Sequence, residues 1–228
     1  DVVFTANGTT SGVRVPNFEW IDPQRKGLTL CDATSYVLAH PISWQHLDVT
    51  TFSWQKSLGG EAAHGVLILS PRAIERAKNY QPKWPIPKLF RFAKEGHLDT
   101  ALFQGQTLNT PSLLCVEDCL CSLKWADRLG GQEALLARAM KNATVLHEWV
   151  RRTPWIKNLA TDPKTWSYSS VCLQTTDKGV IALPEKEHRQ FFGTMAALLE
   201  KEGVAFDILG HRAAPPCRRR PRAAAVRP

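Results

Sequence analysis

The sequence contains no run of about 18 apolar residues, so we expect no membrane-spanning helix and no membrane partner. We also find no secretory signal, because neither a basic region nor an apolar segment follows Asp1. There is no initiating Met and the chain begins within a strand-like run, so we expect it to be a piece of a longer protein. Hydrophobic residues make up 43% and charged residues 22% of its 228 residues, which is typical of a soluble protein with a sizeable core.

Acidic residues are missing from Arg212 onward, whereas six arginines lie there. The rest of the chain has 23 basic and 21 acidic residues, so the formal net charge of +8 belongs mostly to this tail. A nucleic-acid-binding domain normally carries a basic face within its folded body, so we expect no nucleic-acid partner. Residues 217–228 are almost entirely Arg, Pro and Ala, which predicts either a disordered basic tail or a reading-frame error in a GC-rich gene.

No Cys-X-X-Cys pair occurs among the six cysteines. Cys115, Cys119 and Cys121 lie close together, but no further ligands follow at the spacing of a metal site. We therefore expect no metal site. Buried free thiols are the better interpretation, and they indicate a protein of the reducing cytoplasm.

Short apolar runs bounded by polar turns predict buried strands at Val2–Thr5, Leu28–Cys31, Val49–Ser53, Val66–Leu69, Ser170–Gln174 and Val204–Leu209. Capping residues and apolar periodicity predict helices from Ser70 towards Tyr80, Thr110 to about Leu129, Gln132 to Arg152 and Glu185–Glu202. This order predicts an α/β domain over residues 1–140, with its sheet covered on both faces. A small α+β domain over residues 141–216 and the tail over 217–228 would follow.

Lys56 follows a predicted buried strand and precedes Gly59 and Gly60, so its amine is expected at a strand end. A lysine desolvated there has a lowered pKa and can form an imine, although it can also simply reach solvent. Asp32 ends an earlier strand, and an acid near such a lysine could keep the pyridine nitrogen of pyridoxal 5'-phosphate protonated. Alternatively, Asp32 caps a turn with Thr34 or Ser35.

Five segments, in this order, resemble phosphoserine aminotransferase, a class V pyridoxal-phosphate-dependent aminotransferase, in its alphaproteobacterial type. They are Asn7-Gly-Thr-Thr-Ser-Gly12, Cys31-Asp-Ala-Thr-Ser35, Ser53-Trp-Gln-Lys56, Gly59-Gly60 with Ala63-His-Gly65, and Leu108-Asn-Thr-Pro111. The resemblance runs from residue 1 to about Pro216. It implies the type I pyridoxal-phosphate-dependent transferase (aspartate aminotransferase-like) fold, with a truncated large domain and a small α+β C-terminal domain.

The resemblance also implies roles in a cofactor site for pyridoxal 5'-phosphate. Lys56 would be the catalytic residue, carrying the cofactor and moving a proton during transamination. Asp32 would pair with the pyridine nitrogen, Thr9 would contact the region of the ring hydroxyl, and Gln55 would bind the phosphate.

Asn109 and Thr110 would reach the phosphate of the neighbouring subunit's cofactor, which implies a homodimer with shared active sites. Thr110 also suits phosphate from its own position, because it is predicted to head a helix whose backbone N–H groups attract anions.

The stretch Gly210-His-Arg212 resembles the family's substrate-binding segment, which implies that His211 and Arg212 contact the substrate. Arg218 or Arg219 falls near the position that binds the substrate carboxylate, and arginine suits this role through bidentate pairing. The apolar residues that would hold these two arginines in a strand are absent, which supports the reading-frame interpretation.

The implied activity is amino transfer from glutamate to 3-phosphohydroxypyruvate, a phosphorylated keto acid, in serine biosynthesis. The family's N-terminal part is missing, so we expect this polypeptide alone to bind the cofactor poorly and to lack measurable transamination. Alanine–glyoxylate transamination or cysteine desulfuration on the same fold is one alternative, although no cysteine stands out on a mobile loop. A non-catalytic fragment or basic-tailed binding protein is another.

Overall fold

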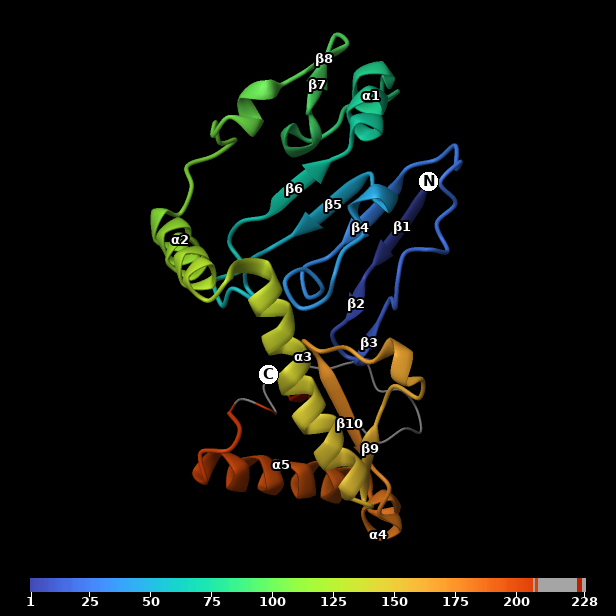
Figure 1. The fold of residues 1–228 in the computed structure, drawn as a ribbon, viewed down its shortest axis with the longest axis vertical. Coiled ribbons are helices and arrows are strands. Elements are labelled where there is room, and N and C mark those ends of the chain that lie inside the picture. The colour runs from blue at the N-terminus through green and yellow to red at the C-terminus, as the bar shows by residue number, and fades with distance from the viewer. Residues whose placement is uncertain (207, 209–224, 227–228) are drawn as a thin grey trace. The chain divides into compact units, whose positions relative to one another are not determined.

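The computed structural model describes residues 1–206, 208 and 225–226 of the chain (Figure 1). These divide into two compact units. The first comprises residues 1–5, 17–34 and 42–129, and the second comprises residues 6–16, 35–41 and those from Gly130 onward. The domain boundaries expected at residues 140 and 216 stay predictions. Within the described residues, no helix has both the length and the apolar character needed to cross a membrane.

The first unit contains a four-stranded sheet in the order β1-β4-β5-β6 (Figure 1). Its strands are β1 (Val2–Thr5), β4 (Thr29–Asp32), β5 (Val49–Phe52) and β6 (Val66–Leu69). The first three run parallel, and β6 pairs antiparallel with β5. All four predicted strands are therefore present, with ends shifted by at most one residue.

The prediction that all four strands are buried is wrong at the edges of this sheet. The inner strands β4 and β5 bury Thr29, Cys31 and Thr50. The edge strands have a neighbour on one side only, and they leave Val3 77% and Ile68 39% exposed. Apolar composition alone does not distinguish an edge strand from a central one.

Helix α1 (Pro71–Asn79) begins as predicted, with the Ser70 side chain accepting a hydrogen bond from the Ala73 amide. Helix α2 (Leu113–Arg128) begins later than predicted. Its N-cap is Ser112, whose hydroxyl accepts from the Cys115 amide at 3.5 Å, so Thr110 does not head the helix. Serine is at least as good an N-cap as threonine, so Ser112 can replace Thr110 in this role.

Between α1 and α2 the chain is mostly irregular. It nevertheless contains short 3₁₀ turns and a small hairpin that the sequence did not indicate: β7 (Ala93–Lys94) and β8 (His97–Leu98).

The second unit is built on α3 (Gly131–Arg152), followed by β9 (Ile156–Asn158) and β10 (Val171–Thr175). The helices α4 (Lys178–Ala182) and α5 (Glu185–Lys201) come next, and the short strands β2 (Asn7–Gly8) and β3 (Val13–Arg14) also belong to this unit. Strand β10 pairs antiparallel with β9 and with β11 (Ala225–Val226). The core of the second unit is formed by residues on α3, β9 and β10: Leu146, Val150, Ile156, Val171 and Leu173.

The long helices and β10 confirm the sequence prediction for this unit, whereas β9 was missed. The strand expected over Val204–Leu209 is absent at 204–206 and 208, and residues 207 and 209 lie outside the described part. In the tail only Ala225–Val226 is described, so the predictions for residues 217–228 stay open.

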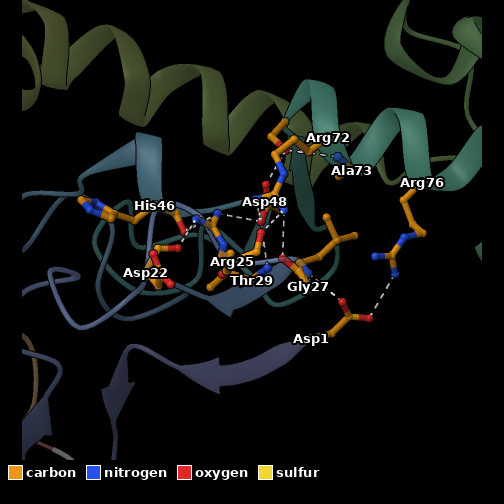
Figure 2. Close-up of polar contacts among 12 residues, drawn as sticks. Asp1, Asp22, Arg25, Gly27, Thr29, His46, Asp48, Arg72, Ala73 and Arg76 are labelled. Atoms are coloured by element: carbon orange, nitrogen blue, oxygen red, sulfur yellow. Dashed lines mark hydrogen bonds and ion pairs between the residues drawn. The ribbon is translucent and has the colours of Figure 1, made fainter.

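A buried carboxylate anchors the start of β5, the strand that leads to Lys56 (Figure 2). Asp48 is 2% exposed and accepts hydrogen bonds from the Arg25 guanidinium at 2.8 Å, the Thr29 amide at 2.9 Å and the Ser70 hydroxyl at 2.9 Å. Burial by itself raises the pKa of this carboxyl, but the hydrogen bonds more than offset it, so its pKa lies below the ordinary value. Asp48 thus joins β4, β5 and the start of α1.

Candidate functional site

Asp32 and the segment containing Lys56 leave the sheet at neighbouring strand ends. Asp32 is the last residue of β4 and pairs with Thr51 of β5, and the Ala33 amide donates to the Thr51 carbonyl at 2.8 Å. Lys56 follows shortly after the end of β5. In open α/β sheets, ligands bind at the carboxyl ends of parallel strands. The two predicted residues therefore lie at the edge where such a fold places its ligand.

Asp32 is held by a local turn. One oxygen of its carboxylate, Oδ1, accepts from the Thr34 amide at 2.9 Å and from the Thr34 hydroxyl at 2.7 Å. The turn-capping role considered from the sequence is thus present, with Thr34 as the partner. It does not exclude a cofactor contact, because an ionised carboxylate has two oxygens and about four acceptor sites. The side chain is exposed at the strand end, where a ligand can reach it.

Lys56 lies on a short loop with defined turns. The Gly59 amide donates to the Lys56 carbonyl at 3.0 Å, and the Gly60 amide donates to the Trp54 carbonyl at 3.1 Å. Gly59 has a φ of +72°, a conformation that residues with a side chain rarely adopt. The neighbouring Leu58 is buried and fixes the loop from inside. The half-buried Lys56 side chain is therefore presented from an ordered loop.

Two buried polar atoms beside Lys56 have no hydrogen-bond partner among the described residues: the Ser53 hydroxyl and the Trp54 indole nitrogen. Buried donors are normally satisfied, so these two atoms could accept a further partner, although eight other buried side-chain atoms of the described residues share this property. Gln55, half-buried between them and Lys56, adds an amide. Pyridoxal phosphate has an aldehyde, a ring nitrogen and a phosphate. The Lys56 amine suits the aldehyde, the Asp32 carboxylate suits the ring nitrogen, and the Gln55 amide and the Ser53 hydroxyl suit the phosphate. The residues present fit this cofactor.

The other predicted site residues lie on other segments of the chain. Thr9 belongs to the second unit, where its carbonyl accepts from the Ser170 hydroxyl at 2.7 Å, so its cofactor contact stays a prediction. Asn109 and Thr110 are exposed in the segment before α2. The residues expected to bind substrate lie outside the described part: His211, Arg212, Arg218 and Arg219.

His64 is a residue of this region to which the sequence assigned no role. It stacks on Trp54 and accepts a hydrogen bond from the Ser112 amide. Its inclusion in the segment Ala63-His-Gly65 was the only signal, because a contact spanning 48 positions has no local pattern. Among the described residues, no group of His, Cys, Asp and Glu is arranged to hold a metal ion.

No family model matches the chain, but individual proteins of known function do. Phosphoserine aminotransferase from Methanosarcina barkeri is 49% identical over 215 residues, which cover 94% of this chain and 55% of that protein. The chain is a homologue of phosphoserine aminotransferase. It spans about half the length of the curated relatives it matches, and its assignment to the alphaproteobacterial type stays a prediction.

Solved structures show the fold of this phosphoserine aminotransferase homologue. The phosphoserine aminotransferase of Cytophaga hutchinsonii matches with a TM-score of 0.72 and 20% identity, covering 99% of this chain and 57% of that one. An alanine–glyoxylate aminotransferase from Nostoc sp. matches with a TM-score of 0.65 and 14% identity, covering 99% and 55%. The α/β fold of the pyridoxal-phosphate-dependent aminotransferases is therefore confirmed, in agreement with the sequence prediction.

Proposed function

We propose that this chain supplies the lysine and the acid of a phosphoserine transaminase site. The reaction transfers the amino group of glutamate to 3-phosphohydroxypyruvate, giving phosphoserine and 2-oxoglutarate. One observation carries the proposal: in a homologue of phosphoserine aminotransferase, Asp32 and the Lys56 loop leave the sheet at the ends of paired parallel strands. We infer a role in serine biosynthesis from the proposed product, and cysteines outside disulfides support a reducing compartment such as the cytoplasm.

Bound pyridoxal phosphate supplies an electron sink that makes the Cα proton of an amino acid removable. The Lys56 amine would hold the cofactor covalently and would afterwards carry that proton. The Asp32 carboxylate would keep the pyridine nitrogen protonated. Gln55 would bind the cofactor phosphate, and the Ser53 hydroxyl next to it is a further donor.

The proposal includes a homodimer with shared sites. Asn109 and Thr110 are exposed in their own unit, so their polar groups are available to a second copy of the chain. Both substrates are anionic, and arginine pairs with carboxylate and phosphate through two parallel hydrogen bonds. The proposal keeps the substrate contacts expected from the sequence. They are His211 and Arg212 for the substrate, and Arg218 or Arg219 for its carboxylate.

The alternatives differ in what supports them. Alanine–glyoxylate transamination shares the fold, but a fold by itself does not specify a substrate. Cysteine desulfuration requires a cysteine on an active-site loop, and Cys31, Cys115, Cys119 and Cys172 are buried in strands or in a helix. Similarity to phosphoserine aminotransferase at nearly half of all aligned positions favours the proposed reaction.

Covalent trapping tests the lysine. The chain is incubated with pyridoxal phosphate and reduced with borohydride, and peptide mass spectrometry locates the pyridoxyl group. Even with the weak cofactor binding expected of this chain alone, Lys56 is expected to be labelled above Lys124, an exposed lysine of α2 that serves as an internal control. The Asp32→Asn variant is expected to label less at Lys56 and equally at Lys124. Equal labelling of the two lysines in the unchanged chain would contradict the proposal.

Competition tests the substrate. Phosphoserine added before reduction is expected to lower the label at Lys56 more than alanine or cysteine at the same concentration. The label at Lys124 reports loss of free cofactor to the added amino acid, so the ratio of the two lysines is compared. Equal ratios for all three amino acids would count against phosphoserine as the substrate.

A further inference from the structure

His64 connects the loop that carries Lys56 to Ser112, at the start of α2. The imidazole of His64 stacks on the Trp54 indole, with ring centroids 5.3 Å apart and planes 17° apart. Its Nε2 accepts a hydrogen bond from the backbone amide of Ser112 at 3.3 Å. Ser112 is the N-cap of α2 and lies two residues after Thr110. The contact therefore joins the lysine loop to the segment proposed to bind phosphate.

A second contact joins the same two segments one turn further along the helix. The buried Cys115 thiol donates to the Glu61 carboxylate at 3.4 Å. The loop can approach Trp54 only because residue 60 is glycine: a Cβ there would lie 2.5 Å from Cδ1 of the Trp54 ring. The stacking, the amide contact and the thiol contact thus belong to one packed arrangement of residues 54–64 against residues 112–115.

The direction of the hydrogen bond defines the chemical form of His64. Because the Ser112 amide can only donate, Nε2 is the acceptor in this contact, and a ring hydrogen is assigned to Nδ1. Nδ1 is buried and has no partner among the described residues. An unsatisfied buried donor destabilises this position of the ring. The stacking on Trp54 and the hydrogen bond from Ser112 are the contacts that offset this cost.

We propose that His64 is a positioning residue that orders the segment Asn109–Ser112 against the Lys56 loop. Its importance for catalysis rests on the proposed function. If Asn109 and Thr110 bind the phosphate of a cofactor in a second copy, His64 links the lysine loop of one site to the phosphate contacts of the other. Only Pro111 separates Thr110 from Ser112, so the hydrogen bond of the Ser112 amide restricts the positions that the Asn109 and Thr110 side chains can take.

Hydrogen exchange of the Ser112 amide tests the proposal without any cofactor. His64→Phe keeps a ring to stack on Trp54 but removes the acceptor, whereas His64→Gln keeps an acceptor at similar reach. Ser112 exchange is expected to become roughly three- to tenfold faster in His64→Phe, the range for losing one neutral hydrogen bond, and to stay within about twofold in His64→Gln. The Ala73 amide, bound to the cap of α1, is a matched control in the same unit.

Unchanged Ser112 exchange in His64→Phe would overturn the proposal. Faster exchange of Ser112 and Ala73 by the same factor would also overturn it, because it would indicate a general loss of stability. The link to phosphate is tested by labelling Lys56 with pyridoxal phosphate or pyridoxal: His64→Phe is expected to lower the preference for the phosphorylated form, and His64→Gln to restore it. A retained preference contradicts the link. Absence of Lys56 labelling in the unchanged chain refutes the proposed function and leaves the exchange result standing.

Discussion

Replacing Asp48 with Asn removes the charge at the centre of the network in Figure 2 and keeps the size of the side chain. Its main partner, Arg25, is 13% exposed, so the guanidinium would lose its counter-charge in a largely dry place. Arg72 lies further away, at 3.5 Å, and is 42% exposed, so it contributes less. A hydrogen bond to a charged group contributes about 1.5–3 kcal/mol, and breaking a buried pair costs more. We expect Asp48→Asn to lower the free energy of unfolding of the first unit by about 3 kcal/mol.

The sign of the pH dependence follows from the lowered pKa of Asp48 in the folded chain. In the unfolded chain the pKa of this carboxyl is about 3.9, so the unfolded chain takes up the proton first as the pH falls. The stabilisation is therefore fully present above about pH 5 and is lost as the pH falls through the folded pKa. The difference between the unchanged chain and Asp48→Asn should be large at pH 7 and should shrink towards pH 3.

Urea denaturation with hydrogen exchange of peptides from β4 and β5 measures this free energy for the first unit. Asp22→Asn is the matched control, because Asp22 is exposed and its side chain caps a local turn through the Gln24 amide. We expect this control to change the free energy by less than about 0.5 kcal/mol. A similarly small effect of Asp48→Asn, or a difference that is as large at pH 3 as at pH 7, would show that the Asp48 carboxylate does not stabilise the first unit.

Three further predictions concern the loop and the second unit. Gly60→Ala should displace the Trp54 ring and speed Ser112 exchange, whereas Gly65→Ala, whose Cβ would lie 3.9 Å from the nearest atom, should not. Burial lowers the pKa of His40 to about 3, so its NMR shifts should stay constant from pH 8 to pH 5, and titration there would contradict the burial. Leu173→Ala should destabilise the second unit by about 2–5 kcal/mol in urea denaturation; a loss under about 1 kcal/mol would contradict tight packing.

The parts of the fold that depend on local chemistry could be predicted from the sequence. The strands β4 and β5 follow from short apolar runs, and α1 follows from a serine cap before proline. The Asp32 and Lys56 pair could be placed because each follows a predicted strand, and parallel strands end at the same edge of a sheet.

Contacts between distant segments could not be predicted in this way. The Ser112 amide and His64 are 48 positions apart, and nothing in either segment indicates the other. The second unit takes residues 6–16 and 35–41 from within the first, an interleaving that has no compositional boundary. The exposure of Val3 depends on its strand being at an edge, which is a property of the sheet and not of the strand.

The proposed function depends most on Lys56 as the residue that would carry the cofactor. The direct measurement is the mass of the tryptic peptide containing Lys56 after the chain is treated with pyridoxal phosphate and borohydride. We expect the pyridoxyl increment on Lys56 at several times the level on Lys124, and its loss from this peptide in Lys56→Ala. A Lys56 peptide labelled no more than the Lys124 peptide would contradict Lys56 as the residue that carries the cofactor.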